Sequence, residues 1–232
     1  SFCRRNRGIN NNGAYEVDMS TIAHNTTSVW MDIKTANANV TLTFKLDCLA
    51  DNSFRFEIDE KSPIKPRFRV TQVITNEIVL RPAQVTSNIA NVTMQCDNNR
   101  VSIHAKPFKV QFYESGNLML TVNGQNLMHF EHLRSRVVPA ADNDEDPDTW
   151  EETFDGYTDS KPNGPEAVAL DFHFEDSDIL FGIPEHHDTF ALRRTIYGEP
   201  YRLYTLDVTN YELDSRMPNY GAIPVIYGHG NG

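Results

Sequence analysis

Two pairs of histidines are the first residues whose type and spacing suggest chemistry, because imidazole is a common metal ligand. His129 and His132 lie three positions apart, which would place both rings on one face of a helix. The apolar residues around them alternate and predict a strand instead, where this spacing points the rings to opposite faces. His186 and His187 are adjacent, and ordinary polar packing is favoured over convergence on one ion. We therefore expect no metal, and no other cofactor is indicated.

Carboxylates offer a second kind of chemistry. The string Trp30-Met31-Asp32 could be taken for a nucleophile motif, but it lies in an alternating strand and the rest of the motif is missing. Asp207 follows the aromatic-rich run Tyr201–Leu206. A sugar site needs both features, since aromatic rings stack on C–H faces and a carboxylate accepts hydrogen bonds from hydroxyls. On the residues alone, a core tyrosine followed by a turn aspartate is the favoured interpretation.

Composition and the absence of other motifs exclude several classes of function. The 232 residues are 39% hydrophobic and 23% charged, which is typical of a globular chain. A formal charge of −11 opposes the phosphate-neutralising surface that nucleic-acid binding requires. No apolar run approaches the roughly 18 residues of a membrane span. There is also no Gly-rich phosphate loop and no Gly-X-Ser-X-Gly elbow, so nucleotide chemistry and serine hydrolysis have no support.

The elements that must position any site are strands. From Ser28 to Leu133 the apolar residues alternate, as they do in half-buried strands. The predicted strands centre on Val29–Ile33, Val40–Leu46, Phe54–Ile58, Val101–Ala105, Val110–Phe112 and Leu118–Val122. Turn residues separate them, including the pair Asn123-Gly124, which is favoured in tight turns. This meander predicts an all-β chain folded as a β-sandwich.

A strongly acidic stretch interrupts the strand pattern. Residues 141–160 contain nine acids and no Lys or Arg, which predicts a mobile insertion, although we expect Trp150 and Phe154 to pack on the sandwich. Strand signals resume at Val168–Phe174, Tyr201–Leu203 and Ile223–Val225. The predicted organisation is an N-terminal segment over 1–27, sandwich strands over 28–140, the insertion over 141–160 and a continuation of the sandwich over 161–232 that is truncated at its C-terminus.

Cysteines and glycosylation sequons bear on the compartment. Cys3, Cys48 and Cys96 are an odd number, so at least one thiol is free or pairs outside this chain. We expect Cys48 and Cys96 to be buried and reduced, because buried thiols are common core residues. Three Asn-X-Thr sequons, at Asn25, Asn39 and Asn91, are acceptor candidates in a secretory protein. Because a chain rich in Asn and Thr contains sequons by chance, the residues leave the compartment open.

Several strings in one order resemble a known family. They are Ser1-Phe2-Cys3-Arg4-Arg5-Asn6-Arg7, Arg67-Phe68-Arg69-Val70, Phe130-Glu131-His132, Trp150-Glu151-Glu152-Thr153-Phe154, Asp159-Ser160-Lys161-Pro162, Phe181-Gly182-Ile183-Pro184-Glu185-His186 and Pro200-Tyr201-Arg202-Leu203-Tyr204. The order resembles the N-terminal part of glycoside hydrolase family 31, and within it the two-subunit α-glucosidases of the endoplasmic reticulum. The resemblance covers nearly the whole chain.

This resemblance implies a galactose-mutarotase-like β-sandwich that precedes a catalytic (β/α)8 barrel. It also implies a retaining α-glucosidase that trims α-1,3-linked glucose from N-linked glycans in glycoprotein quality control in the endoplasmic-reticulum lumen. The family's nucleophile motif, Trp-X-Asp-Met-Asn-Glu, and its acid/base motif, Gly-Asp-Asn, are both missing from this sequence. The chain alone is therefore expected to be inert. Its expected partners are the remainder of the alpha subunit, a regulatory beta subunit and the glycan.

The resemblance also assigns residues. It places an active-site loop around 196–210, in which Asp207 accepts hydrogen bonds from substrate hydroxyls and Tyr204 and Thr209 are loop neighbours. The mammalian enzymes that the chain resembles have Phe where this chain has Thr209, which puts aromatic stacking at the second sugar in doubt. Cys3 is expected to pair with a cysteine upstream. The alternative from a different class is a free-standing carbohydrate-binding β-sandwich, for which surface aromatics and Asp207 would suffice.

Overall fold

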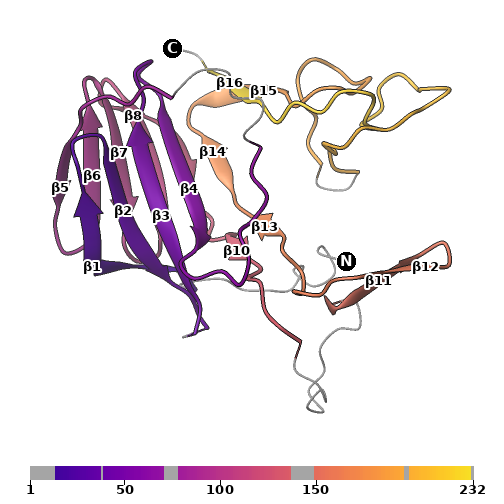
Figure 1. Cartoon of the computed structure of the whole chain (residues 1–232). Coiled ribbons are helices and arrows are strands. Elements are labelled where there is room, and N and C mark those ends of the chain that lie inside the picture. The colour runs from indigo at the N-terminus through magenta and orange to yellow at the C-terminus, as the bar shows by residue number, and fades with distance from the viewer. Residues whose placement is uncertain (1–13, 38, 71–77, 137–148, 196–198, 231–232) are drawn as a thin grey trace. The chain divides into compact units, whose positions relative to one another are not determined.

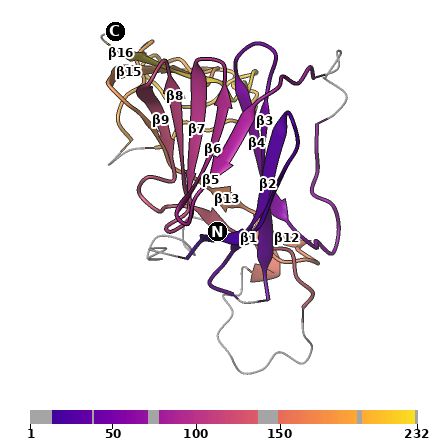
Figure 2. The same ribbon diagram turned by 90° about the vertical axis from the view of Figure 1, so that its left-hand side faces the viewer.

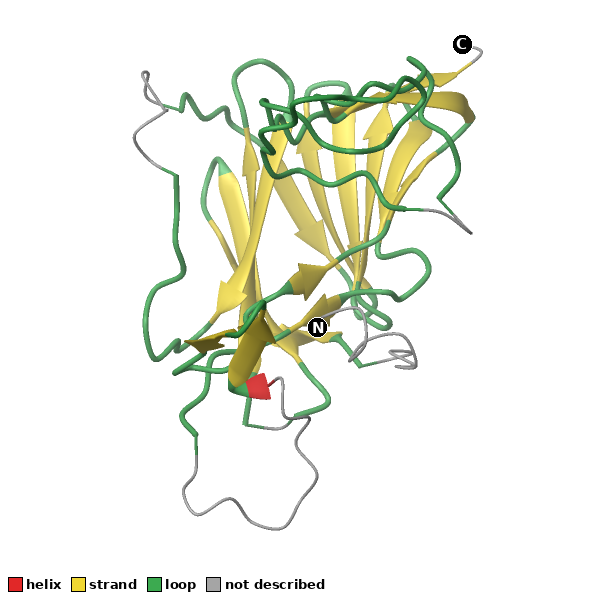
Figure 3. Ribbon diagram, turned by 90° about the vertical axis from the view of Figure 1, so that its right-hand side faces the viewer, coloured by secondary structure: helices red, strands yellow, loops and turns green. Residues whose placement is uncertain are grey.

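A computed structural model describes residues 14–37, 39–70, 78–136, 149–195 and 199–230 (Figure 1). Within these ranges the chain forms β-strands and no α-helix, and Thr149 alone lies in a short 3₁₀ turn (Figure 3). No helix in these ranges is long and apolar enough to span a bilayer. The chain divides into two compact units, Ser1–His173 and Phe174–Gly232, here called unit 1 and unit 2. The all-β class predicted from the alternating pattern is confirmed.

The strand bounds are β1 Glu16–His24, β2 Ser28–Lys34, β3 Thr41–Cys48, β4 Phe54–Glu60, β5 Gln84–Ser87, β6 Asn91–Cys96, β7 Asn99–His104, β8 Lys109–Glu114, β9 Asn117–Val122, β10 His129–Phe130, β11 Glu151–Phe154, β12 Tyr157–Ser160, β13 Val168–Ala169, β14 Phe172–Phe174, β15 Ser177–Gly182 and β16 Ile226–Gly230. One sheet has the order β1-β2-β3-β4 and a second has the order β14-β9-β8-β7-β6-β5. The pairs β10–β13, β11–β12 and β15–β16 form small two-stranded sheets.

Unit 1 is a sandwich of the two large sheets, which face each other in Figure 2. Its core comes from alternate residues of the strands, as the period of two requires. On β3, Leu42, Phe44 and Leu46 are fully buried, and on β7 Val101 and Ile103 are fully buried. These positions belong to one hydrophobic cluster that draws on both sheets. The sandwich predicted from the sequence is thus confirmed.

Three strands of the sandwich, β1, β5 and β6, were not predicted from the sequence. Strand β1 lies inside the stretch assigned to an N-terminal segment and pairs antiparallel with β2, so the sheet begins before Ser28. A shift in register between Asp18 and Ala23 breaks the alternation of β1, which is why its pattern is weak. Strand β6 has the expected alternation, with Val92, Met94 and Cys96 buried, so its pattern was present in the sequence and was overlooked. Strand β5 has only four residues, which is too short to show a period.

The expectation of reduced cysteines is wrong. Cys48 and Cys96 are buried as predicted, but they form a disulfide whose Cα atoms lie 6.4 Å apart. Cys48 ends β3 in one sheet and Cys96 ends β6 in the other, so the bond joins the two layers of the sandwich. The sequence gives no sign of this pairing, because the two cysteines are 48 positions apart and only the stacking of the sheets brings them together.

The acidic stretch is ordered in its second half. Strands β11 and β12 form an antiparallel hairpin with Phe154 opposite Tyr157, where the sequence predicted a mobile insertion as far as residue 160. Trp150 is buried as predicted, with the Arg134 guanidinium 5.3 Å from its ring. Phe154 does not pack on the sandwich and is 84% exposed, because the hairpin carries it away from the core. Residues 141–148 lie outside the described residues.

Unit 2 is a two-stranded sheet closed by a long loop. Strands β15 and β16 pair antiparallel, and the described residues between them, 183–195 and 199–225, form no further strand. The strand predicted at Tyr201–Leu203 is therefore wrong. The segment Ile223–Val225 precedes β16 and is also loop. The loop leaves β15 at Gly182, whose φ is +116° and where a Cβ atom would lie 2.4 Å from the Val225 carbonyl oxygen, so only glycine fits there.

Candidate functional site

Asp207, the predicted sugar contact, lies on the loop of unit 2 and is exposed to solvent. Its Oδ1 accepts a 2.7 Å hydrogen bond from the Tyr220 hydroxyl, and Oδ2 receives none from the described residues. The same hydroxyl lies 3.3 Å from the Val208 carbonyl oxygen. The hydrogen bond to Asp207, followed by desolvation, raises the pKa of Tyr220 above its ordinary value. Asp207 is thus a surface carboxylate with one oxygen held and one open to a ligand.

Asp188 is the polar centre that holds the first half of this loop. Its side chain is 2% exposed and pairs with Arg193, whose Nη2 lies 2.6 Å away. It also accepts hydrogen bonds from the Tyr201 hydroxyl at 2.6 Å and from the Thr189 amide at 2.8 Å. Burial opposes ionisation of this carboxyl, but these hydrogen bonds outweigh it and lower the pKa of Asp188 below its ordinary value. Tyr201 is therefore an anchor of the loop and not a strand residue.

The adjacent histidines pack against different partners. His186 shares a 3.1 Å hydrogen bond between Nε2 and the Arg202 carbonyl oxygen, so this ring nitrogen carries the proton. His187 stacks on Tyr211 with ring centroids 3.8 Å apart, and its Nδ1 is hydrogen bonded to the Asn219 amide. This is the polar packing predicted for the pair. Among the described residues, no three His, Cys, Asp or Glu side chains are placed to hold a metal ion.

The other residues that the sequence singled out donate no hydrogen bond to the Asp207 carboxylate within the described part of the chain. Tyr204 is 52% exposed and Thr209 is exposed, and neither is hydrogen bonded to the Asp207 carboxylate. In unit 1, Asp32 on β2 is ion-paired with Lys61, which is a structural role. Burial, followed by the charge of Arg134, lowers the pKa of His132 below its ordinary value. Residues 196–198 of the predicted active-site loop lie outside the described residues.

A pocket of about 550 Å³ lies in unit 2 beside the start of the loop. Its wall includes a stack of three aromatic rings, in which Phe181 lies between Phe190 and Tyr227 at centroid distances of 4.8 and 5.2 Å. The lining is mostly apolar and does not include Asp207. The pocket and the carboxylate are therefore separate features of the same loop.

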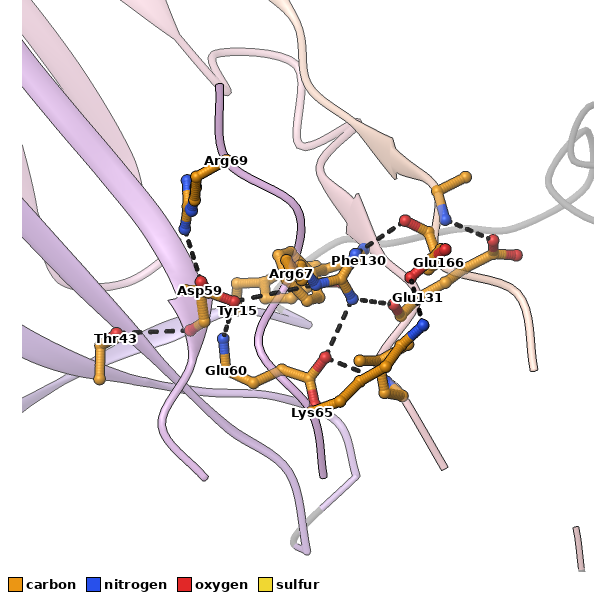
Figure 4. A network of polar contacts seen from close by, with 12 residues as sticks. Tyr15, Thr43, Asp59, Glu60, Lys65, Arg67, Arg69, Phe130, Glu131 and Glu166 are labelled. Atoms are coloured by element: carbon orange, nitrogen blue, oxygen red, sulfur yellow. Dashed lines mark hydrogen bonds and ion pairs between the residues drawn. The ribbon is translucent and has the colours of Figure 1, made fainter. Parts of the chain in front are cut away.

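Arg67 is the centre of a largely buried cluster of charges in unit 1 (Figure 4). The sequence did not predict this cluster, because Arg67 was noted only as part of a family motif. The Arg67 guanidinium donates to Glu60 Oε1 at 2.9 Å and to the carbonyl oxygens of Glu131 at 2.5 Å and Glu166 at 2.7 Å. It also lies 4.4 Å from the centroid of the Phe130 ring. These contacts tie the segment after β4 to β10 and to the loop before β13.

The three sequons have different surroundings. Asn25 and Asn39 are exposed, and Oδ1 of Asn25 accepts the amides of Thr27 at 2.9 Å and Ser28 at 2.8 Å. Asn91 is half-buried at the start of β6, and its buried Oδ1 accepts no hydrogen bond from the part of the chain that the structure describes. Attachment of sugar at any of the three stays a prediction.

The fold and sequence define a class of protein. The sequence pattern of the glycosyl hydrolase 31 N-terminal galactose mutarotase-like domain matches residues 43–232, and the chain belongs to this family. This agrees with the sandwich of unit 1 and confirms the resemblance found in the motifs. The described residues form no (β/α)8 barrel.

Particular relatives narrow the class. The chain is 33% identical to neutral alpha-glucosidase AB of Mus musculus over 99% of its own length, and 31% identical to the glucosidase 2 subunit alpha of Schizosaccharomyces pombe over 98%. It is similar in structure to the glucosidase II alpha subunit in an alpha3-Glc2-bound form, with a TM-score of 0.85 and 31% identity over 98% of the chain. The chain spans 28% of the length of each of these proteins.

Proposed function

We propose that the chain is the non-catalytic N-terminal part of an α-glucosidase and that its Asp207 loop helps to form the sugar site. The observation that carries this proposal is the similarity to glucosidase II alpha subunits over nearly the whole chain, combined with an exposed carboxylate at the position that the family motif assigns. Asp207 binds a hydroxyl of the reacting glucose, while the remainder of the alpha subunit supplies the barrel with the nucleophile and the acid/base.

The substrate is α-1,3-linked glucose on N-linked glycans, and the reaction proceeds with retention of configuration. Support comes from the similarity to solved structures of the glucosidase II alpha subunit in alpha3-Glc2-bound and Glc1Man2-bound forms. The enzyme works in the endoplasmic-reticulum lumen with a glucosidase II beta subunit. The proposed pairing with a beta subunit is supported by a similar solved chain, 31% identical, which lies in a heterodimeric complex of the catalytic subunit and the binding domain of the regulatory subunit.

Replacement of Asp207 in the full-length enzyme tests this function. A carboxylate that accepts a charge-assisted hydrogen bond contributes about 1.5–3 kcal/mol, and hydroxyl contacts strengthen as the sugar distorts towards the transition state. Asp207→Asn should therefore lower kcat/KM on an α-1,3-linked glucose disaccharide by about ten- to several-hundredfold, with losses in both kcat and KM. The thermal midpoint should not change, because the side chain is exposed.

A matched control is available in the same loop. Asp214 is exposed and already has a positive φ of 58°, which Asn tolerates, so Asp214→Asn should leave activity unchanged. Full activity of Asp207→Asn would refute the role of the loop. Sugar binding by the isolated 232-residue chain, independent of the barrel, would instead support the free-standing carbohydrate-binding module.

A further inference from the structure

We infer that Tyr220 is the positioning residue for Asp207: its hydroxyl holds one carboxylate oxygen so that the other faces the sugar. This inference rests on the proposed function and adds a residue that neither the motifs nor the spacing of the sequence indicated. Tyr220 lies 13 positions after Asp207, and the two side chains meet only because the loop of unit 2 folds back on itself.

The hydrogen bond between Tyr220 and Asp207 has a short, ordinary donor–acceptor distance. The Tyr220 hydroxyl and Asp207 Oδ1 are 2.7 Å apart, within the usual range for a hydroxyl donor. Both side chains are in contact with solvent, and Tyr220 is 62% exposed. A hydrogen bond in water contributes little to folding, because water offers the same partners to the unfolded chain. Its main consequence here is therefore the orientation of the carboxylate.

Backbone contacts fix Tyr220 from both sides. The Gly221 amide donates to Glu185 Oε2 at 2.9 Å, and the Glu185 amide donates to the Gly221 carbonyl oxygen at 2.8 Å. On the other side, the Asn219 amide donates to the Glu185 carbonyl oxygen at 3.2 Å. The phenol ring thus projects from a segment that is held at the residue before it and the residue after it.

The same segment sets the position of Asp207. The Leu206 amide donates a 2.9 Å hydrogen bond to the Asn219 carbonyl oxygen, which aligns the residue before Asp207 with the residue before Tyr220. The two side chains extend from neighbouring backbone positions, and the hydroxyl reaches Oδ1 across the gap. Oδ2 remains open, so a sugar hydroxyl meets one oxygen in a defined direction and not a freely rotating carboxylate.

A held carboxylate is useful in catalysis because preorganised groups do not have to reorient as the reacting ring distorts. The Tyr220 hydroxyl remains protonated at neutral pH, since its pKa is raised, so it can donate throughout the working range of a lumenal enzyme. Loss of this donor leaves the charge of Asp207 in place and removes only its orientation. The expected result is a smaller loss of activity than the loss of Asp207 itself.

A double-mutant cycle in the full-length enzyme tests the inference with Tyr220→Phe, Asp207→Ala and both together. Alanine is used because an asparagine would still accept the hydroxyl hydrogen bond. With an aryl α-glucoside and an α-1,3-linked disaccharide as probes, Tyr220→Phe should lower kcat/KM by about three- to thirtyfold. In the Asp207→Ala background it should have no further effect, because the group that it orients is gone. The thermal midpoints of wild type and Tyr220→Phe should agree.

The outcomes separate this inference from the proposed function. Tyr211→Phe is the control, since this tyrosine in the same loop is 57% exposed and its hydroxyl is not hydrogen bonded among the described residues. If Asp207→Ala is inactive while Tyr220→Phe matches Tyr211→Phe, the positioning role is refuted and the proposed function stands. A full additional loss in the Asp207→Ala background also refutes positioning. If Asp207→Ala keeps full activity, both ideas fail.

Discussion

Removal of the Arg67 guanidinium should destabilise unit 1 far more than removal of a neighbouring arginine. The side chains of Arg67 and its partner Glu60 are only 14% and 7% exposed. Arg67→Met leaves the Glu60 carboxylate buried with the Leu133 amide, 3.0 Å from Oε1, as its remaining donor in the cluster. Breaking a buried ion pair by removing one partner costs about 3–5 kcal/mol, so the free energy of unfolding should fall by that amount.

Arg69, two positions along the same segment, provides the matched comparison. Its guanidinium lies 3.0 Å from Glu57 and 2.5 Å from Asp59, but its side chain is 45% exposed. Exposed ion pairs contribute about 0–1 kcal/mol, so Arg69→Met should have a small effect. Both variants keep a long apolar side chain, but Arg67→Met removes a largely buried charge together with its hydrogen bonds to the carbonyl oxygens of Glu131 and Glu166, whereas Arg69→Met removes an exposed charge.

Urea unfolding followed by tryptophan fluorescence measures both costs, since Trp30 and Trp150 lie in unit 1. Combining Arg67→Met with Glu60→Gln should lower the free energy of unfolding by at least about 1 kcal/mol less than the sum of the two single changes. The glutamine side chain is neutral, so the double variant leaves no unpaired charge in the cluster. The reasoning is refuted if Arg67→Met and Arg69→Met destabilise equally, or if the two changes at Arg67 and Glu60 are additive.

Two further predictions concern the disulfide and the Asp18 carboxylate. Peptide mapping without reduction should find Cys48 linked to Cys96, and replacing both with Ala should cost about 4 kcal/mol for the loop spanning 48 positions; alkylation of both thiols would contradict this. For Asp18, hydrogen bonds from the Ser20 side chain and then Lys34 lower the pKa from 3.8 to about 2. A lowered folded-state pKa contributes stability above pH 3.8 that is lost as the pH falls towards about 2. An NMR titration should show this midpoint moving up in Ser20→Ala, and an unchanged midpoint would remove the assigned cause.

Local patterns predicted the centre of the sandwich, and contacts between distant segments decided the rest. The alternation of Leu42, Phe44 and Leu46 is unbroken, so β3 could be read directly from the sequence. Alternation misled at Tyr201–Leu203, because the Tyr201 side chain there binds Asp188 through its hydroxyl and does not fill a core.

The local sequence pattern predicted less of the candidate site than of the fold. Asp207 was identified only through the family resemblance, since an aspartate after tyrosines is common in turns. Tyr220 carried no signal, because its contact with Asp207 depends on the path of a loop with no regular period. The same limit applied to Cys48 and Cys96, which meet only when one sheet covers the other.

The contacts of Arg67 have a consequence for synthesis of the chain on the ribosome. Its acceptor at Glu166 lies 99 residues later in the sequence. At roughly 5–20 residues per second, translation separates the two by about 5–20 s. During this interval β1 to β4 have been made, but the later segments that close around the guanidinium have not. The apolar face of β3 is uncovered until β5 to β9 of the facing sheet have also been made, and a chaperone that binds nascent chains should meet it in that first part of the interval.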